Sequence, residues 1–222
     1  MFTVLFWLML AVTVLEWTAT WREWQRVRWF SKPGAMILLI AWFTQVGGWQ
    51  GPLLWFGLGL VLSLAGDIFL LFSNRFFLPG LAAFLLAHLA TLVGLTREPL
   101  AASWTLALPV VLIGGVFGVL NGMIRTGLKQ KGEINMQAPV MVYASIISVM
   151  WLMAISTLFR PIWQPIAAIM VSLGAGLFFV SDSILAFNRF VRPTRHGNLL
   201  VMVSYLLAQI LITSGVLTQY VR

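Results

Sequence analysis

The sequence lacks cysteine, has only two histidines and carries few charged residues. Without cysteine, disulfides, zinc–thiolate sites and cysteine nucleophiles are excluded. Two histidines cannot form a three-histidine zinc site, so a zinc hydrolase of the ceramidase type is disfavoured, whereas a mixed Asp/His site stays open. The G-x-S-x-G, P-loop and H-E-x-x-H motifs are also missing, so serine-hydrolase, nucleotide and zincin chemistries have no support.

The scarcity of charge is matched by an excess of apolar residues. Charged residues make up 9% of the 222 residues and hydrophobic residues 60%, with a mean hydropathy of +0.95. A soluble domain has roughly 25% charged residues. A single soluble core cannot bury so much apolar surface, so we expect the solvent of this chain to be lipid. The 11 Trp and 16 Phe suit a protein with two membrane interfaces.

A helix that crosses a bilayer needs about 20 mostly apolar residues, and the sequence predicts eight such spans. Their approximate ranges are Phe2–Thr20, Gly34–Trp49, Pro52–Phe72, Leu78–Leu95, Ser103–Met123, Ala138–Phe159, Ile162–Phe187 and Asn198–Gln219. The apolar N-terminus has no basic segment and no convincing cleavage site, so we expect a first span rather than a removed signal. Because the connections are short, we expect one all-α transmembrane domain over residues 1–222.

The net charge of +8 comes from basic residues in alternate connections between the predicted spans. The connections after the first, third, fifth and seventh spans contain Arg22, Arg26, Arg28, Lys32, Arg75, Arg125, Lys129, Lys131, Arg189, Arg192 and Arg195, and the opposite side contains Arg97, Arg160 and Arg222. By the positive-inside rule, the first set faces the cytoplasm, both termini lie on the other side, and the protein is a multi-pass protein of the inner membrane. The pattern is not a phosphate-binding stripe, so we expect no nucleic-acid partner.

Two aspartates interrupt apolar spans within a repeated motif. Asp67 lies in "GDIFLLFSNRF" and Asp182 in "SDSILAFNRF", 8 and 7 residues before Arg75 and Arg189. Both carboxylates are therefore about 10–12 Å along the helix from a cytoplasmic arginine. The next spans also match, with "FLLAH" at 84–88 and "YLLAQ" at 205–209. The sequence predicts a parallel repeat of four plus four helices, with halves 1–100 and 101–222.

An ionisable side chain within a spanning helix is costly and usually faces the bundle interior or a wet cavity. Two carboxylates that converge in a buried site repel each other, so one stays protonated while the other is ionised. Such a pair provides a general acid beside a general base, in the cytoplasmic half of the bilayer. Alternatively, each Asp could cap or hydrogen-bond a neighbouring helix, or the pair could relay protons or cations in a transporter.

Further polar residues within the predicted spans are candidates for the same site: His88, Tyr143, Ser181, Tyr205 and Gln209. His88 could instead be a hydrogen-bonded packing residue, and the tyrosines could anchor the helices at the interface. Gln209 is not an anchor type and needs partners when buried. Glu16, near the cytoplasmic end of the first span, is expected to reach the interface or to pair with Arg22.

These residues resemble the YhhN/TMEM86 family, the lysoplasmalogenases, over nearly the whole chain. The resemblance rests on "GDIFLL", "FLLAH", "APVMVYASIISVM", "GAGLFFVSDSILAFNRF" and "YLLAQ", in this order. Thr91 departs from the family pattern, which has an aromatic residue after H-x-x. This departure concerns a pocket wall or the headgroup preference rather than the Asp pair.

The resemblance implies hydrolysis of the vinyl ether bond of a lysophospholipid, the lysoplasmalogen, to a fatty aldehyde and a glycerophospho-base. We expect neither a cofactor nor a metal. Vinyl ethers react by protonation of the β-carbon, and water captures the resulting oxocarbenium ion. Glycosidases use a pair of carboxylates to catalyse a reaction through a similar ion. We expect Asp67 and Asp182 to be catalytic. The other expected substrate-binding residues are His88, Tyr143, Ser181, Tyr205 and Gln209, together with Arg75 and Arg189, which would attract the headgroup phosphate.

Two other interpretations remain at this stage. Parallel repeats and buried acids also suit a proton- or cation-coupled transporter that works by alternating access. Helix-breaking residues at matching positions in both halves would favour a carrier, but beside the Asp pair the sequence has only Gly66, whose counterpart is Ser181. The third interpretation is a lipid-binding membrane protein without turnover.

Overall fold

The computed structural model describes residues 3–72, 74–97 and 104–221, which form eight long helices and no strand. The helices are α1 (Val4–Trp21), α2 (Gln25–Val46), α3 (Leu53–Phe72), α4 (Phe77–Thr96), α5 (Ala107–Gln130), α6 (Gln137–Ser156), α7 (Pro165–Ala186) and α8 (Gly197–Tyr220). A π-helical segment, η5 (Phe187–Val191), extends α7. The predicted all-α class is confirmed. Phe2, Ser103 and Arg222, which the sequence assigns to spans or connections, lie outside the described residues.

Among the described helices, seven are long and apolar enough to cross a membrane, and α2 is not one of them. The predicted second span starts at Gly34, but the helix begins at Gln25 and contains Pro33. A proline within a helix removes one N–H donor, which the surroundings of a membrane helix can compensate. The extra turns carry Arg28 and Lys32, whose charges find carboxylate partners inside the bundle.

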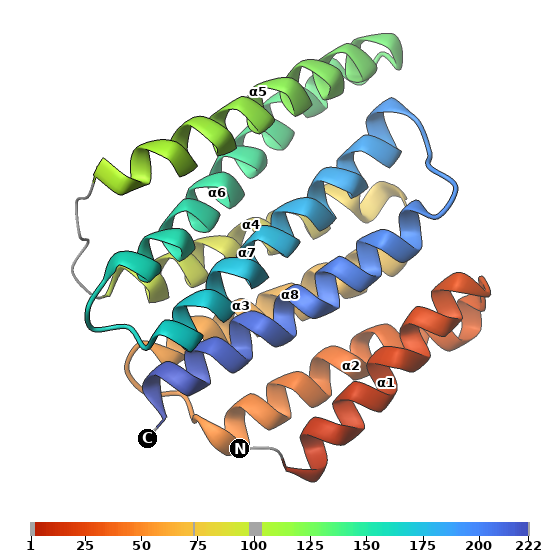
Figure 1. Ribbon diagram of the computed structural model, residues 1–222. Coiled ribbons are helices and arrows are strands. Elements are labelled where there is room, and N and C mark those ends of the chain that lie inside the picture. The colour runs from red at the N-terminus through yellow and green to blue at the C-terminus, as the bar shows by residue number, and fades with distance from the viewer. Residues whose placement is uncertain (1–2, 73, 98–103, 222) are drawn as a thin grey trace.

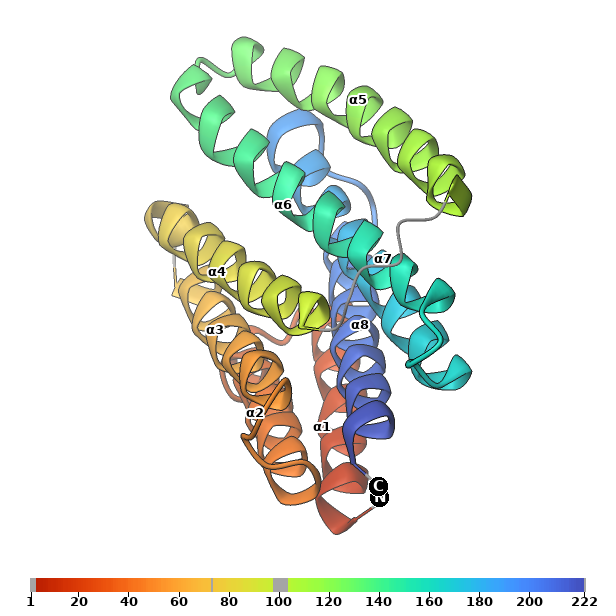
Figure 2. The same cartoon turned by 90° about the vertical axis from the view of Figure 1, so that its left-hand side faces the viewer.

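The helices alternate in direction, so their connections gather at two ends of the bundle (Figure 1). The α1–α2, α3–α4, α5–α6 and α7–α8 connections lie at one end, and both termini lie at the other (Figures 1 and 2). The α5–α6 connection shows how the sequence makes such a turn. Gly132 has φ 71°, a left-handed conformation that ends α5, and Glu133 N–H donates to the Leu128 carbonyl, as in a Schellman motif.

α8 lies in the middle of the bundle and α5 at its edge (Figure 2). α8 packs against α7, α1 and α3, and most of its side chains are buried. α5 packs on α6 and on η5, and only four of its residues are buried, Ile113, Ile124, Gly127 and Leu128. Its approach to η5 is close because residue 127 is glycine, since a Cβ there would lie 2.1 Å from the Phe190 carbonyl oxygen. α5 therefore stands beside the bundle and is fixed at its C-terminal end.

The two hairpins that carry the aspartates, α3–α4 and α7–α8, have the same inter-helix contact. Gly59 and Gly174 each lie eight residues before the aspartate of their motif. A Cβ on Gly59 would lie 3.3 Å from the Ala87 carbonyl oxygen, and one on Gly174 would lie 2.9 Å from that of Ala208. These alanines occupy the same position in "FLLAH" and "YLLAQ". The contact therefore holds both aspartates at corresponding heights on their hairpins.

Candidate active site

Asp67, on α3, is buried with a cation and a phenol as its partners. Lys32 Nζ on α2 lies 3.0 Å from Asp67 Oδ1, and the Tyr205 hydroxyl on α8 donates to Asp67 Oδ2 at 2.6 Å. Asp67 is 1% exposed and Lys32 7%. A buried charge is tolerated when it is paired and hydrogen-bonded. The three residues come from three helices, so the carboxylate joins α2, α3 and α8.

Asp182, on α7, has a different set of partners. The Tyr143 hydroxyl on α6 donates a hydrogen bond to Asp182 Oδ2. His88 Nε2 on α4 lies 2.9 Å from the Tyr143 oxygen and 3.4 Å from Asp182 Oδ2. Because the tyrosine proton is directed at the carboxylate, His88 Nε2 must donate to the tyrosine, which fixes the position of the imidazole proton. His88 and Tyr143 are buried, whereas 13% of the Asp182 side chain is exposed.

Both aspartates line one cavity of about 300 Å³, which we call the central cavity. Its polar wall is formed by Gln25, Arg28, Lys32, Asp67, Ser181, Asp182, Asn198 and Tyr205. The apolar part of the wall includes Leu70, Phe84 and Leu185. The cavity therefore brings together two carboxylates, the Lys32 ammonium group, the Tyr205 phenol and an arginine. Its volume is enough for several waters or a small polar group.

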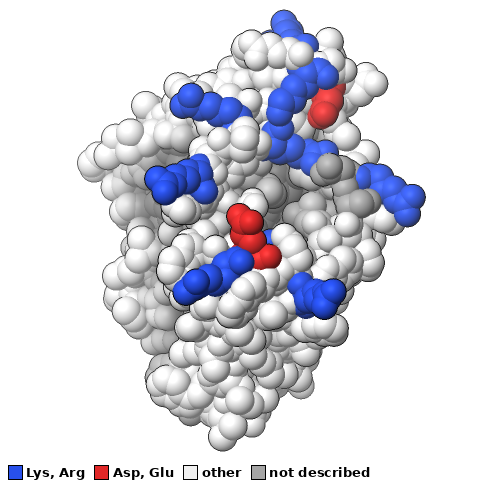
Figure 3. Space-filling view, turned by 90° about the vertical axis from the view of Figure 1, so that its right-hand side faces the viewer, with Lys and Arg blue, Asp and Glu red and all other residues white. Residues whose placement is uncertain are grey.

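A larger hollow of about 860 Å³, the vestibule, lies at the end of the bundle with the basic connections. Its polar lining includes Glu23, Arg28, Arg189, Arg195 and His196. It shares Gln25, Arg28, Leu70, Leu185 and Asn198 with the central cavity, so the two spaces adjoin. Figure 3 shows this end of the molecule, with Lys and Arg side chains around the hollow and acidic side chains at its edge.

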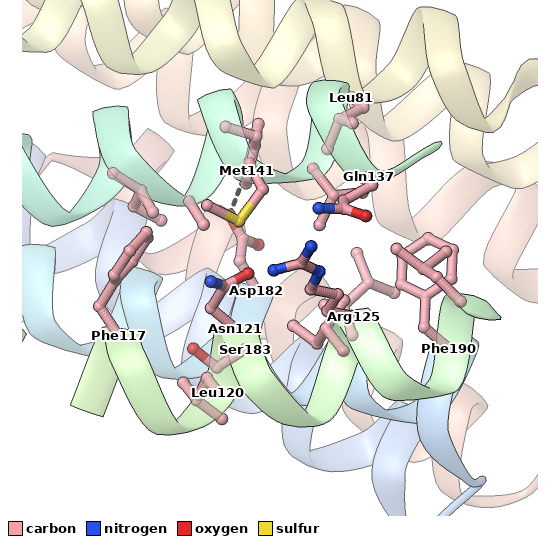
Figure 4. Close-up of a pocket in the computed structure, with 18 of the residues that line it drawn as sticks. Leu81, Phe117, Leu120, Asn121, Arg125, Gln137, Met141, Asp182, Ser183 and Phe190 are labelled. Atoms are coloured by element: carbon pink, nitrogen blue, oxygen red, sulfur yellow. Dashed lines mark hydrogen bonds between the residues drawn. The ribbon is translucent and has the colours of Figure 1, made fainter. Parts of the chain in front are cut away.

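A third space, the apolar groove, lies between α4, α5, α6 and α7 (Figure 4). Its void measures about 60 Å³, and its walls are mostly Leu, Ile, Val and Phe, with Phe117, Ile147 and Phe179 among them. Asp182 lines both this groove and the central cavity, and so do Phe84, Leu70 and Leu185. Asp182 therefore stands where an apolar space meets a polar one.

Comparison with known sequences identifies the family of this chain. A model of the YhhN family matches residues 27–216. The chain belongs to the YhhN family.

Three relatives illustrate the range of the YhhN family. Lysoplasmalogenase TMEM86B of Homo sapiens is 34% identical over 158 residues, which are 71% of this chain and 61% of the human protein. A lysoplasmalogenase of Mycobacterium bovis is 31% identical over 166 residues, which are 72% of this chain and 59% of that protein. The membrane protein YhhN of Escherichia coli is 28% identical over 218 residues, which are 93% and 96% of the two chains. The chain thus spans about three fifths of the length of the two lysoplasmalogenases it matches, and no solved structure matches it.

Most of the site residues predicted from the YhhN resemblance lie together in the structure. Asp67, Ser181, Asp182 and Tyr205 line the central cavity, and Tyr143 and His88 contact Asp182. The Ser181 hydroxyl donates to the Val201 carbonyl at 3.1 Å, which links α7 to α8 beside the cavity. The roles of these residues in a reaction stay predictions.

Three predicted residues lie apart from the carboxylates. Gln209 lines a small buried pocket behind His88, next to Thr91, the residue that departs from the family pattern. Arg189 lines the vestibule, with its guanidinium 3.8 Å from the centre of the Phe77 ring. Arg75 lies over the Phe76 ring at 5.0 Å and is not among the residues that line the cavity, the vestibule or the groove.

Lys32 is the main functional candidate that the sequence did not reveal, because it was assigned to a connection. Glu16 was expected to pair with Arg22 or to reach the interface, and this expectation is wrong. Its side chain is buried and accepts hydrogen bonds from Arg28 Nε at 3.2 Å and from the Ser31 hydroxyl at 2.5 Å. Glu16 thereby holds α2 against α1 and positions Arg28 at the mouth of the central cavity.

The described residues contain no group of three or more His, Asp or Glu that could hold a metal ion. The polar groups of the site are instead a carboxylate paired with an ammonium group and a carboxylate paired with a phenol and an imidazole. These groups can donate and accept protons, as acid–base catalysis requires.

Proposed function

We propose that this protein hydrolyses the vinyl ether bond of lysoplasmalogen-type lysophospholipids and releases a fatty aldehyde and a glycerophospho-base. The names of its relatives from Homo sapiens and Mycobacterium bovis support this activity. The observation that carries the proposal is that Asp67 and Asp182 line one cavity but have different partners. Different surroundings can hold two carboxylates in different protonation states, so that one acts as the acid and the other as the base.

Asp67 is assigned the role of the base. Lys32 supplies a positive charge at 3.0 Å, and the Tyr205 hydroxyl donates a second hydrogen bond; both contacts stabilise the ionised form against the cost of burial. An ionised Asp67 stabilises the positive charge of the oxocarbenium ion and accepts a proton from the attacking water. Water has access because the central cavity adjoins the vestibule.

Asp182 is assigned the role of the acid. Its Oδ2 accepts the Tyr143 hydrogen bond, which leaves Oδ1 to carry the proton that is donated. Because Asp182 also lines the apolar groove, its proton can reach the β-carbon of an alkenyl chain held there. His88 and Tyr143 act as positioning residues, since they fix the orientation of the carboxyl group.

The reaction balances with these groups alone. Asp182 transfers its proton to the β-carbon, a C–H bond forms, and the former double bond becomes an oxocarbenium ion. Water adds to the α-carbon and gives its proton to Asp67. The hemiacetal then collapses: its hydroxyl proton returns to Asp182, the C–O bond to glycerol breaks, and Asp67 returns a proton to the leaving oxygen. Both aspartates end as they began.

The proposal includes a membrane topology. The end of the bundle with the basic connections would face the cytoplasm of a bacterial inner membrane, both termini would face the other side, and the two Asp hairpins would belong to a parallel repeat. The partner contacts support the repeat, because α2 and α6 each supply a partner to the aspartate of the next helix, while α8 and α4 each supply one to the aspartate of the other half.

A transporter that uses the same Asp pair has weaker support. Carriers of this kind bind their ions at breaks in spanning helices. α3 continues as an α-helix through Asp67, and α7 does so through Asp182.

The test is an assay of the purified protein in detergent with lysoplasmenylethanolamine as the substrate and released aldehyde as the readout. We expect aldehyde from the wild type and a loss of about a hundredfold or more in Asp67→Asn and in Asp182→Asn, because each removes one half of the acid–base pair. Circular dichroism would show whether the variants keep their helices. No aldehyde from the wild type, or full activity in both variants, would overturn the proposal.

A further inference from the structure

The apolar groove contains four polar side chains that the reaction scheme does not use. Ser183 donates a hydrogen bond to the Phe179 carbonyl, and the other three are Asn121, Arg125 and Gln137. Asn121 and Arg125 lie one turn apart on α5, and Gln137 begins α6. Figure 4 shows all three directed into the groove, with Asp182 nearby. None of them forms a hydrogen bond or an ion pair with another described residue. Arg125 is exposed, and Asn121 and Gln137 are partly exposed, so all three can bind a polar group that enters the groove.

The groove has a polar end and an apolar end. Gln137 and Arg125 lie toward the end of the bundle with the basic connections, while Phe117 and Ile147 lie deeper. Arg125 and Asn121 are about 6 Å apart along the α5 axis, and Arg125 and Phe117 about 12 Å. The order along the groove is therefore a cation, then amides and the Asp182 carboxyl group, then hydrocarbon.

We propose that Arg125, assisted by Asn121 and Gln137, binds the phosphate of a lysophospholipid whose single hydrocarbon chain lies in the apolar groove. This inference rests on the proposed function and identifies where the substrate binds. A lysophospholipid has the same order of groups as the groove: a phosphate, a glycerol that carries the ether oxygen, and a chain. With the phosphate at Arg125, the ether lies beside Asp182 and the chain points toward Phe117 and Ile147.

Arginine suits this role because its guanidinium donates paired hydrogen bonds to phosphate oxygens. Its position near the C-terminal end of α5 places it at the depth of lipid headgroups. The void of about 60 Å³ is smaller than a hydrocarbon chain, so the chain would enter from the side by displacing α5, which stands at the edge of the bundle and has few buried residues (Figure 2). The polar product then has a separate exit through the central cavity and the vestibule, while the aldehyde returns to the membrane through the groove.

The test measures binding rather than turnover, so that it does not depend on catalysis. The probe is a short-chain lysophospholipid with a saturated 1-alkyl ether, which has no vinyl ether bond to cleave. A 1-alkylglycerol with the same chain and no phosphate is the second probe. Quenching of tryptophan fluorescence in the purified protein gives the Kd of each.

We expect Arg125→Gln to raise the Kd of the lysophospholipid at least about tenfold, as for a charge-assisted hydrogen bond, and to leave the Kd of the alkylglycerol unchanged. Arg125→Lys should raise the Kd of the lysophospholipid by a smaller factor. The control is Lys129→Gln, one turn further along α5, which is exposed and outside the groove and should change neither Kd. Inorganic phosphate should fail to displace the lipid.

Equal binding of the lysophospholipid by Arg125→Gln and the wild type would overturn the inference. An equal loss for both probes would do so too, because it would indicate a change of fold, and displacement by phosphate alone would indicate a site without a lipid chain. If instead the wild type binds the saturated ether through Arg125 but never releases aldehyde from the vinyl ether, the phosphate site stands and the proposed hydrolase activity fails.

Discussion

Replacing Lys32 with methionine tests whether Asp67 is held as an anion. Methionine keeps the length and the apolar part of the lysine side chain and removes the charge 3.0 Å from Asp67 Oδ1. The carboxylate is then buried without its cation, at 1% exposure. Removal of one partner of a buried ion pair costs about 3–5 kcal/mol. Because Asp67 keeps the Tyr205 hydrogen bond and borders the central cavity, we expect the lower end, about 3 kcal/mol.

For a chain of this size, 1 kcal/mol shifts the Tm by about 2–4 °C, so Lys32→Met should lower it by about 6–12 °C. Protonation of Asp67 would remove part of the free-energy cost of the unpaired carboxylate. A protonated Asp67 cannot accept a proton from water. We therefore also expect aldehyde release to fall about a hundredfold or more. Tryptophan fluorescence during heating measures the first effect, and an aldehyde assay at a temperature below both transitions measures the second.

The double variant Lys32→Met/Asp67→Asn separates the two effects. It leaves no charge buried at this position, so most of the lost stability should return while the activity stays low. Lys129→Met, an exposed lysine at the end of α5, should match the wild type in both measurements. A Lys32→Met variant with an unchanged Tm and unchanged turnover would refute the assignment of Asp67 as an ion-paired base.

Four further variants test other parts of the structure. Tyr143→Phe removes the hydrogen bond to Asp182, and we expect kcat in the aldehyde assay to fall about tenfold while the Tm changes little. Gly174→Ala, whose Cβ would meet backbone atoms at 2.9 Å, should lower the free energy of unfolding by about 1–3 kcal/mol. Gly114→Ala is the control: its Cβ would have no atom within 4 Å, so the substitution should raise the free energy of unfolding by about 0.5–1 kcal/mol. Glu16→Gln should lower the Tm, because the bond to Arg28 weakens, and should have only a small effect on kcat. An unchanged Tm would contradict the role of Glu16 in joining α1 to α2.

The sequence is sufficient to predict the aspartates and most of the helices. A carboxylate inside an apolar run is costly, so it stands out from hydropathy alone, and the repeated motif identifies its counterpart. Lys32 does not stand out, because it lies beside Pro33 among other basic residues and resembles a connection. Only the packing of α2 against α3 shows that this lysine is buried and that Asp67 is its partner.

Contacts between helices are the part that one sequence cannot supply. Arg22 is nearer to Glu16 along the chain, but the α1–α2 turn brings Arg28 to it instead. The apolar groove depends on where α5 stands relative to α4, α6 and α7, and hydropathy contains no information on that position. In the sequence, Arg125 therefore cannot be distinguished from the other basic residues of the connections, although in the structure it faces the same groove as Asp182.

The most direct test of the Asp-pair mechanism is the hydrolysis of a lysoplasmalogen in D₂O, with the aldehyde analysed by mass spectrometry. Protonation of the β-carbon by Asp182, whose acidic hydrogen exchanges with solvent, would place one deuterium on the carbon next to the carbonyl group. The account predicts this singly deuterated aldehyde from the wild type and none above background from Asp182→Asn. Aldehyde without deuterium at that carbon, or the same labelled yield from the variant, would contradict it.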